Sequence, residues 1–331
     1  MFTRSDLEDR ERKLLAANAV LAAESRGRDL HENEDPLRTC FQRDRDRIVH
    51  SKAFRRLKHK TQVFLSPEGD HYRTRLTHTM EVAQVARVTA RALALNEDLA
   101  EACALGHDLG HTPFGHLGEE VLTEKLGRPF VHADQSLRVV EKLERGGAGL
   151  NLTWEVRDGI VSHSWSQPEP GTYEGWIVRY ADRIAYLCHD VDDAIRAGLI
   201  DVDDLPEITK ERLGKGYSER LGSLVNDLVE SSDKSGRIGL TEPVHEAMRA
   251  LRDFMFERIY KGPEVAAEQR AARHVLGNLF DYFSANPEEM AGDYRDRDDP
   301  IDTQVADYIS GMTDRYAIKV YSELFVPSPT N

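Results

Sequence analysis

The stretch His107-Asp108-Leu109-Gly110-His111-Thr112-Pro113-Phe114-Gly115-His116 brings three imidazoles and one carboxylate into ten consecutive residues. Imidazole and carboxylate together suit a divalent cation of borderline to hard character. Adjacent His and Asp side chains can bind one ion only where the backbone bends, as it does at a helix end. The two glycines and the proline of the stretch favour such a bend. The sequence therefore predicts a metal site at the end of a helix.

Composition narrows the class of protein around this motif. The 331 residues carry 44 basic and 58 acidic side chains, a formal net charge of −14. That balance excludes a protein that coats nucleic acid or an anionic membrane with its whole surface. Cys40, Cys103 and Cys188 show no pairing by spacing, so we expect neither a disulfide framework nor a cysteine zinc site. Because the sequence lacks a signal-like apolar run and any run of about 18 apolar residues, we expect a soluble, cytoplasmic protein with no membrane partner.

Two helical patterns lead up to the motif. Over residues 76–95, His78 shares one inward face with apolar residues at helical spacing. Asn96 then has the character of an N-cap, with two acidic residues in the following turn, and predicts a helix that ends at His107. A single histidine on an apolar face is usually a core residue. Two successive inward-facing helices, however, would bring His78 within reach of His107.

The segment from Arg38 to Lys60 reverses the acidic balance of the chain, with nine basic side chains and only two acidic ones. Surface ion pairs on a solvated helix are the commoner explanation of such a pattern. The functional alternative is contact with a polyphosphate or a nucleic acid, because arginine matches phosphate oxygens in a bidentate manner. Gln62, Arg73 and Arg75 extend the segment toward His78.

Downstream of the motif, His116 and Glu119 stand three residues apart and can share one face of a helix. A carboxylate beside an imidazole orients the ring and raises its basicity, as in a general acid and base pair. The alternative is an acidic residue that the helix dipole favours at a helix start. We interpret the two as a catalytic dyad, because the neighbouring metal candidates need such a partner. His132, taken singly, is a residue at the N-terminus of the next predicted helix.

A helix over residues 176–196 carries an apolar stripe, with Asp182, Tyr186 and Asp190 at i, i+4 and i+8 on another face. A solvated face is the usual explanation of such a line. A cavity-lining face is the alternative, with Asp182 as a metal ligand, Tyr186 as a stacking surface and Asp190 as an acceptor for a hydroxyl. Periodicity leaves both open. The run 164–175 before this helix predicts a loop.

Helical signals dominate the rest of the chain, and no series of alternating strands with hairpin turns is evident. Further predicted helices span 5–26, 244–259, 264–283 and 303–325. We find no Walker loop, dinucleotide glycine fingerprint or serine nucleophile elbow. We predict a single all-α domain over residues 1–331, with a core at about 70–197 and a C-terminal helical extension at 198–331. The later helices are interpreted as scaffold or as contacts of a homo-oligomer.

The order of His78, His107-Asp108 and Asp182, H…HD…D, resembles that of the HD-domain metal-dependent phosphohydrolases. A longer match is more specific: the segments FQRDRDR at 41–47 and AFRRLKHKTQVF at 53–64 resemble the dGTPase-like deoxynucleoside triphosphate triphosphohydrolases. Further matching motifs are TRLTH at 74–78, QSLR at 135–138, ADRIAY at 181–186 and GMTDRYA at 311–317. The resemblance covers about residues 35 to 325, and it implies an HD-domain helical fold with additional C-terminal helices.

This resemblance implies hydrolysis of a dNTP to a deoxynucleoside and inorganic triphosphate. The metal ligands that it implies are His78, His107, Asp108 and Asp182, for Mg²⁺, Mn²⁺ or another transition metal. The implied catalytic residues are His116 with Glu119 near the α-phosphate, and His111 and His132 on the phosphate side. The implied substrate contacts are Gln62 and Arg75, Arg183 to the phosphates, Tyr186 to the sugar and Asp190 to the 3′-hydroxyl.

Two rival hypotheses stay open at this point. One keeps the HD fold but changes the substrate, to that of a nucleotidase or phosphodiesterase acting on another nucleotide. The abundance of arginine before His78 favours a triphosphate instead. The other is a regulator that binds a nucleotide or single-stranded nucleic acid through the basic segment. An activating second nucleotide and weak binding of single-stranded DNA are further partners to test.

Overall fold

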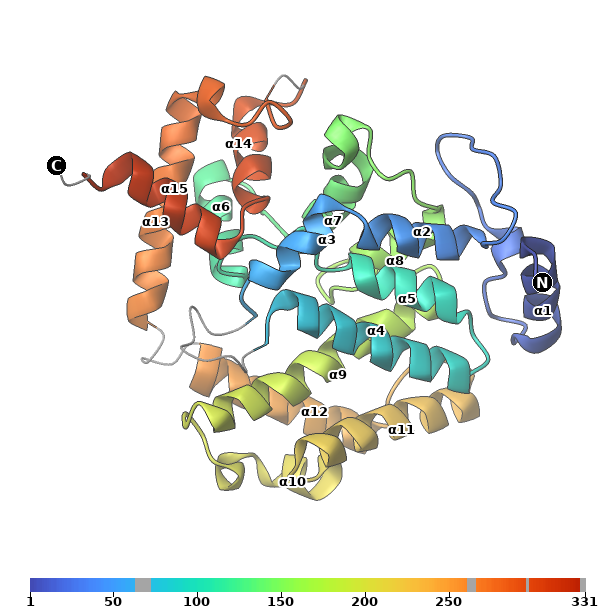
Figure 1. Ribbon diagram of the computed structural model, residues 1–331. Helices are drawn as coiled ribbons and strands as arrows, with labels where there is room; N and C mark the ends of the chain where they lie inside the picture. The colour runs from blue at the N-terminus through green and yellow to red at the C-terminus, as the bar shows by residue number, and fades with distance from the viewer. Residues whose placement is uncertain (63–72, 261–265, 296–297, 328–331) are drawn as a thin grey trace. The chain divides into compact units, whose positions relative to one another are not determined.

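The computed structural model describes residues 1–62, 73–260, 266–295 and 298–327 (Figure 1). The regular elements of this described part are helices, and β pairing in it is limited to an isolated antiparallel bridge between Thr61 and Thr74. The expectation of an all-α chain is therefore confirmed. Within the same residues, no helix is both long enough and apolar enough to cross a membrane.

The chain separates into two compact units. Unit 1 consists of Met1–Val49, His78–His107 and Asn151–Gly262, and unit 2 of His50–Thr77, Asp108–Leu150 and Pro263–Asn331. The boundary between His107 and Asp108 divides the sequence motif between the two units. A single domain over the whole chain stays a prediction.

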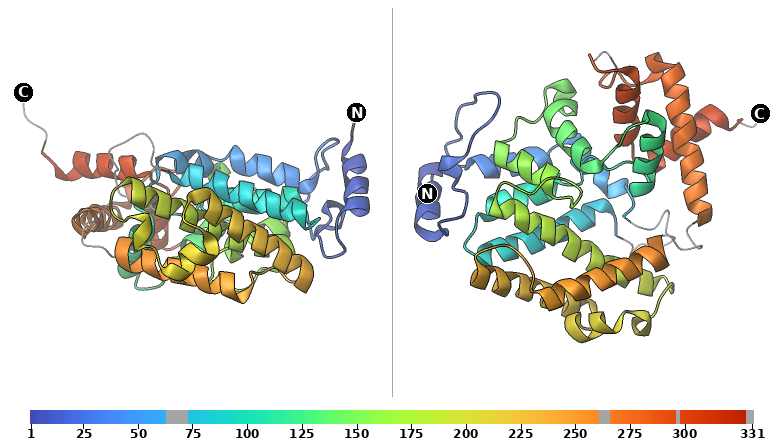
Figure 2. Two further views of the ribbon diagram at one scale, coloured as in Figure 1. Left: turned by 90° about the horizontal axis from the view of Figure 1, so that it is seen from below. Right: turned by 180° about the vertical axis from the view of Figure 1, so that it is seen from behind.

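Unit 1 is built around two buried helices. Its α-helices are α1 (Arg4–Leu14), α2 (Cys40–Val49), α4 (Arg75–Ala92, which begins in unit 2), α5 (Glu97–Gly106), α8 (Trp154–Ser162), α9 (Tyr173–Arg196), α10 (Glu207–Leu213), α11 (Tyr217–Ser235) and α12 (Glu242–Met255). Shorter helical turns lie at Ala22–Glu24, Val202–Asp204 and Phe256–Tyr260. Helix α5 packs against α2, α8 and α9, and α9 packs also against α11 and α12, which lie beside it in Figures 1 and 2.

The packing of α5 fixes the position of His107. The Asn96 side chain caps the helix by accepting a hydrogen bond from the Leu99 amide at 3.2 Å, which confirms the predicted N-cap. At the other end, a Cβ on Gly106 would lie 2.5 Å from the Ile160 side chain. Only glycine lets α8 approach this closely, and His107 follows directly as the C-cap residue.

Unit 2 contains its own apolar core. Its helices are α3 (Lys52–Arg56), α6 (His116–Leu126), α7 (His132–Arg138), α13 (Ala266–Ala285), α14 (Ile301–Ser310) and α15 (Asp314–Phe325), with shorter turns at Leu57–His59, Val139–Leu143, Arg145–Gly147 and Pro287–Glu289. Helix α13 packs against α6, α14 and α15. The buried cluster between them includes Phe114, Leu122, Leu276, Phe280 and Ile309.

The predicted helix over 5–26 is wrong in its second half, because α1 ends at Leu14. Backbone amides beyond that point find acceptors outside a helix. The Val20 amide donates to the Glu174 carboxylate at 3.0 Å, and the Ala22 amide donates to the Glu11 carboxylate at 2.7 Å. Tertiary acceptors thus replace the intrahelical carbonyls.

The predicted helix over 303–325 is also wrong, because it is two helices, α14 and α15. The break begins at Gly311, where a Cβ would lie 2.6 Å from the Tyr294 hydroxyl. Thr313 then caps α15 by accepting a hydrogen bond from the Tyr316 amide at 3.2 Å.

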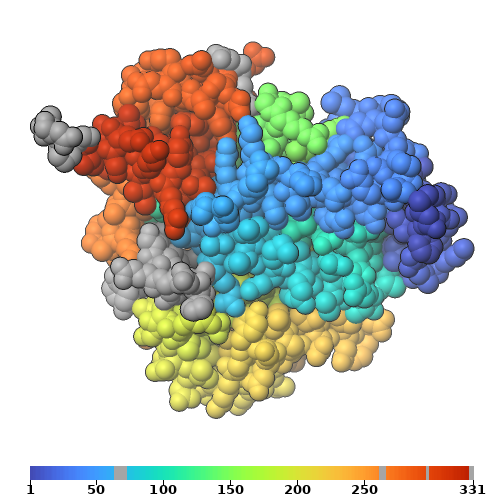
Figure 3. Space-filling model, viewed as in Figure 1, coloured from blue at the N-terminus to red at the C-terminus, as the bar shows by residue number. Residues whose placement is uncertain are grey.

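A surface cavity of about 240 Å³ lies between α4 and α11 in unit 1. Both helices reach the surface on the face drawn in Figure 3, α4 in cyan and α11 in gold. Its lining residues are Gln84, Val85, Val88, Ser218, Leu221, Gly222, Val225 and Asn226. None of the predicted site residues lines this cavity.

Candidate functional site

Unit 1 brings together His78 from α4, His107 from the end of α5 and Asp182 from α9. The Nε2 atom of His78 lies 3.2 Å from Asp182 Oδ1, and that of His107 lies 3.7 Å from the same oxygen. The two Nε2 atoms are 3.3 Å apart. Three side chains from separate helices therefore direct their donor atoms at a common point.

The chemistry of this group fits a divalent cation. His107 Nδ1 lies 2.6 Å from the Ala104 carbonyl oxygen. Because a carbonyl only accepts, Nδ1 carries the proton and the lone pair of Nε2 faces Asp182, as in imidazoles that bind metals. Burial raises the pKa of Asp182, but His78 and His107 outweigh it and hold the pKa well below its usual value. The cluster thus offers two nitrogen ligands and one anionic oxygen.

Asp108, the fourth predicted ligand, directly follows His107 and belongs to unit 2. The guanidinium of Arg75 donates to Asp108 Oδ2 at 2.9 Å, and His111 Nε2 lies 3.2 Å from Oδ1. Arg75, Asp108 and His111 are all buried. Arg75, predicted to contact the substrate, therefore forms a buried ion pair with this carboxylate.

Three imidazoles surround Glu119 in unit 2. The distances to Glu119 Oε1 are 2.8 Å from His116 Nδ1, 3.1 Å from His132 Nδ1 and 3.2 Å from His111 Nδ1. The other oxygen, Oε2, accepts from the His132 amide at 3.0 Å. The side chain of His116 is 74 % exposed and that of Glu119 only 11 %. His116 is therefore the member of the group that another molecule can reach.

The carboxylate and the imidazoles shift one another's pKa. Burial opposes ionisation of Glu119, but His132 and His116 outweigh it and lower the pKa of the carboxyl well below its usual value. Burial by itself would lower the pKa of His132, but the charge of Glu119 and its hydrogen bond to the ring have the larger effect. The pKa of His132 is therefore raised above its usual value. Burial, together with the charges of Arg75 and His132, lowers the pKa of His111 to about 3. The group thus combines an ionised carboxylate with a neutral His111.

The turn between His111 and His116 depends on close backbone approach. A Cβ on Gly110 would lie 2.2 Å from the Ser136 amide nitrogen, and the Gly110 amide donates to Ser136 Oγ at 2.8 Å. Gly115 has a φ of +61°, in the region that glycine tolerates best, and a Cβ there would lie 2.7 Å from the guanidinium of Arg75. These glycines let α7 and Arg75 come close to the turn.

The remaining predicted substrate contacts lie in both units. Gln62 is half-buried in unit 2. In unit 1, the Arg183 guanidinium lies over the Trp165 ring at 4.2 Å from its centroid, and burial lowers the pKa of Arg183. Burial also raises the pKa of Tyr186 to about 12. Asp190 is buried, and the Tyr260 hydroxyl donates to its Oδ2 at 2.6 Å.

His189 and Tyr260 are candidate functional residues that the sequence interpretation missed. His189 lies directly before Asp190 and two helical turns after Asp182, so it shares a helix face with a proposed ligand. That spacing could have identified His189 from the sequence as a neighbour of the proposed metal ligands. No local sequence pattern could have identified Tyr260, because it lies 70 residues after its partner Asp190.

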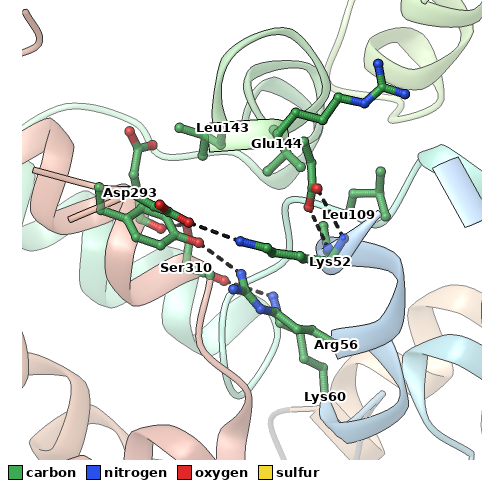
Figure 4. A pocket seen from close by; sticks show the side chains of 14 residues that line it. Lys52, Arg56, Lys60, Leu109, Leu143, Glu144, Asp293 and Ser310 are labelled. Atoms are coloured by element: carbon green, nitrogen blue, oxygen red, sulfur yellow. Dashed lines mark hydrogen bonds and ion pairs between the residues drawn. The ribbon is translucent and has the colours of Figure 1, made fainter. Parts of the chain in front are cut away.

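The basic segment is largely paired with acidic groups in the structure. Within unit 1, ion pairs join Arg38 to Asp35 and Asp46, Arg43 and Arg47 to Glu32, and Arg45 to Asp98 and Glu101. Within unit 2, Lys52 Nζ lies 3.1 Å from Asp293 Oδ2 and Arg56 donates to the Tyr294 hydroxyl at 2.9 Å (Figure 4). Ion pairing thus accounts for much of this segment.

Lys60 is the buried end of that segment. Its Nζ donates to the carbonyl oxygens of His111 and of Ser310, the latter at 2.8 Å. Burial lowers the pKa of Lys60 to about 7. Lys60 therefore joins the backbone at His111 to the end of α14.

Two family models match this chain. Residues 75–195 match the HD domain model, and residues 238–323 match that of a phosphohydrolase-associated domain. A deoxyguanosinetriphosphate triphosphohydrolase-like protein of Caldanaerobacter subterraneus subsp. tengcongensis is 52% identical over 337 residues, which cover 99% of this chain and 97% of that protein. A Clostridium perfringens protein of the same description is 48% identical, with 99% and 98% covered.

A solved structure supports the fold. The crystal structure of a phosphohydrolase from Bacteroides thetaiotaomicron is 18% identical, with a TM-score of 0.53 over 86% of this chain and 69% of that one. At this identity the match concerns the fold alone. The family follows from the full-length relatives: this chain belongs to the deoxyguanosinetriphosphate triphosphohydrolase-like family of HD-domain phosphohydrolases.

Proposed function

We propose that this chain hydrolyses deoxynucleoside triphosphates to a deoxynucleoside and inorganic triphosphate. The observation that carries the proposal is the Glu119 group, in which one buried carboxylate contacts three imidazoles and only His116 is exposed. A carboxylate that fixes an accessible imidazole is the arrangement of a general acid and base catalyst. Relatives that are described as triphosphohydrolase-like support the choice of substrate class.

In the proposed reaction, the oxygen of a water molecule adds to the α-phosphorus while the bond from that phosphorus to the 5′-oxygen breaks. His116, oriented by Glu119, donates a proton to the leaving 5′-oxygen. The water oxygen stays on the released triphosphate, and the proton that this water loses passes to solvent, from which His116 regains the proton that it gave, so atoms and charge balance. Arg75 and Arg183 provide positive charge for the phosphate oxygens.

We propose that His78, His107, Asp108 and Asp182 hold a divalent ion, Mg²⁺ or Mn²⁺. When bound, such an ion stabilises the negative charge that develops on phosphoryl oxygens. The donor set of unit 1 supports this assignment. Asp108→Ala should abolish both turnover and retention of metal, and full activity in that variant would contradict the ligand assignment.

Product analysis tests the proposal directly. Purified protein is incubated with Mg²⁺ or Mn²⁺ and each dNTP in turn, and the products are separated by anion exchange. Equal amounts of deoxynucleoside and triphosphate support the proposal. Release of orthophosphate alone indicates a nucleotidase, and release of a monophosphate with pyrophosphate indicates a phosphodiesterase-type reaction. Absence of turnover with salt-sensitive binding of DNA indicates a binding regulator.

The same assay extends to the finer predictions. Repeating the dNTP panel with a second nucleotide measures base preference and activation together. A homo-oligomeric state, which we also propose, is measured by sedimentation. A cytoplasmic location stays a prediction from the sequence.

A further inference from the structure

We infer that His189 is a positioning residue that orients the metal ligand His78, and that Asp190 and Tyr260 hold His189 for this task. The inference rests on the proposed function, since it takes His78 as a ligand of the ion. It assigns a role to two residues, His189 and Tyr260, that lie outside the sequence motifs on which the family resemblance rests.

The first step is the contact between the two imidazoles. His78 directs Nε2 toward Asp182, and its opposite nitrogen, Nδ1, lies 2.8 Å from His189 Nε2. The rings meet edge to face, with centroids 5.0 Å apart and an interplanar angle of 79°. Both side chains are buried, His78 at 1% and His189 at 0% exposure. The contact thus satisfies the facing nitrogens of two buried rings.

Asp190 and Tyr260 lie on the other side of His189 from His78. Its Nδ1 lies 2.7 Å from Asp190 Oδ1. The second oxygen of Asp190 accepts from the Tyr260 hydroxyl at 2.6 Å. Burial and the neighbouring Asp190 raise the pKa of Tyr260 well above its usual value, so the phenol keeps the proton that it donates. A chain of polar contacts therefore runs from Tyr260 through Asp190 and His189 to His78.

This series of polar contacts favours one tautomer of the His189 ring and one of the His78 ring. Asp190 Oδ1 lies at ion-pair distance from His189 Nδ1, although the two atoms do not form a hydrogen bond. The negative charge of the carboxylate at that distance favours a proton on Nδ1, which leaves His189 Nε2 as an acceptor. His78 must then donate from Nδ1, and its Nε2 keeps a lone pair on the side of Asp182 and His107. An imidazole bound to metal commonly has its second nitrogen fixed in this way. The Ala104 carbonyl fixes His107 in the same sense.

The affinity of the protein for a metal ion measures how far His189 positions His78. His189→Leu removes the acceptor, and we expect it to weaken Mn²⁺ binding by roughly 10- to 100-fold, the usual effect of losing such a partner. In His189→Gln the amide oxygen can still accept from His78, so affinity should return to within a few fold of the parent protein. Tyr260→Phe leaves Asp190 in place and should have the smaller effect. Each variant is titrated calorimetrically with MnCl₂ after removal of metal.

Val191→Ala is the matched control. Val191 is buried on the same helix and is not part of the polar chain. It should lower the thermal midpoint without changing metal affinity. If His189→Leu lowers only the midpoint of the metal-free protein and binds Mn²⁺ like the parent, His189 is merely a core residue and the inference is overturned.

Nitrogen NMR of histidine-labelled, metal-free protein gives a second readout. The parent should show His78 protonated at Nδ1, and His189→Leu should show a mixture or the other tautomer. An unchanged tautomer overturns the inference. If parent protein binds Mn²⁺ but releases no triphosphate, the proposed function fails while the positioning role of His189 is still measured. A parent that binds no Mn²⁺ overturns both.

Discussion

The substitution Lys60→Met should change how stability depends on pH. Lys60 is 2% exposed, and its Nζ donates to two backbone carbonyls, those of His111 and Ser310. Burial lowers its pKa from the ordinary 10.5 to about 7. Between those two values the unfolded chain binds more protons than the folded chain. Stability from this group is therefore present above the unfolded pKa and is lost as the pH falls through the folded pKa.

The size of the effect follows from the two pKa values. With 1.36 kcal/mol per pKa unit, acidification from about pH 9 to about pH 7 removes about 2 kcal/mol from the free energy of unfolding through Lys60 alone. Methionine does not titrate, so this contribution disappears in the variant. Its cost is two buried carbonyls without their donor, about 1 to 3 kcal/mol each and the same at every pH. The difference in free energy of unfolding between the parent and the variant therefore has two parts. The part that changes with pH reports the titration of Lys60, and the constant part reports the lost hydrogen bonds.

Urea unfolding followed by circular dichroism, repeated across this pH range, measures the difference between the parent and Lys60→Met. We expect the variant to gain about 2 kcal/mol relative to the parent between about pH 9 and about pH 7. Lys58→Met is the control, because Lys58 is an exposed lysine two residues away in the same segment. A difference that stays constant with pH for Lys60→Met would refute the argument that burial discharges this lysine.

Three further predictions concern the candidate site. Glu119→Ala should lower kcat by roughly 10²- to 10⁴-fold while metal still binds, because it removes the partner that orients His116; loss of metal in the variant would instead make Glu119 a ligand. Asp182→Ala should release the ion and leave the helix content unchanged, as metal analysis and circular dichroism would show, and retention of metal would contradict its role. Trp165→Ala should raise KM by roughly 2- to 30-fold with little change in kcat, because it removes the ring under the Arg183 guanidinium; Trp165→Phe keeps a ring and should recover part of the loss, and a change confined to kcat would argue against positioning of Arg183.

Local sequence patterns predicted the elements that carry the site. The Asn96 cap, the helix before His107 and the long helix with Asp182 lie where capping and periodicity placed them. These features depend on residues three or four apart, so sequence spacing reports them. The errors at 15–26 and 311–313 have the opposite cause. There the backbone amides or a glycine meet partners far along the chain, such as Glu174 and Tyr294.

The basic segment shows the same limit. Its composition left surface ion pairs and phosphate contact open, because a sequence does not show which acidic groups lie opposite. The structure pairs Arg45 with Glu101, which lies 56 residues away in sequence, and Arg47 with Glu32, which lies 15 residues away. Among the basic residues of this segment, all of which the structure describes, Lys60 is the buried one, and it donates a hydrogen bond to the His111 carbonyl.

The sequence by itself determined the all-α class, the order of the proposed ligands and the family, because helix periodicity and motif spacing are local properties of the chain. Only the tertiary structure decided that three imidazoles share the Glu119 carboxylate, and that His189, Asp190 and Tyr260 stand in line behind His78. Most of these contacts join side chains from separate segments of the chain, as between His132 and Glu119, His189 and His78, and Tyr260 and Asp190. Their geometry exists only once apolar packing has fixed those segments against one another.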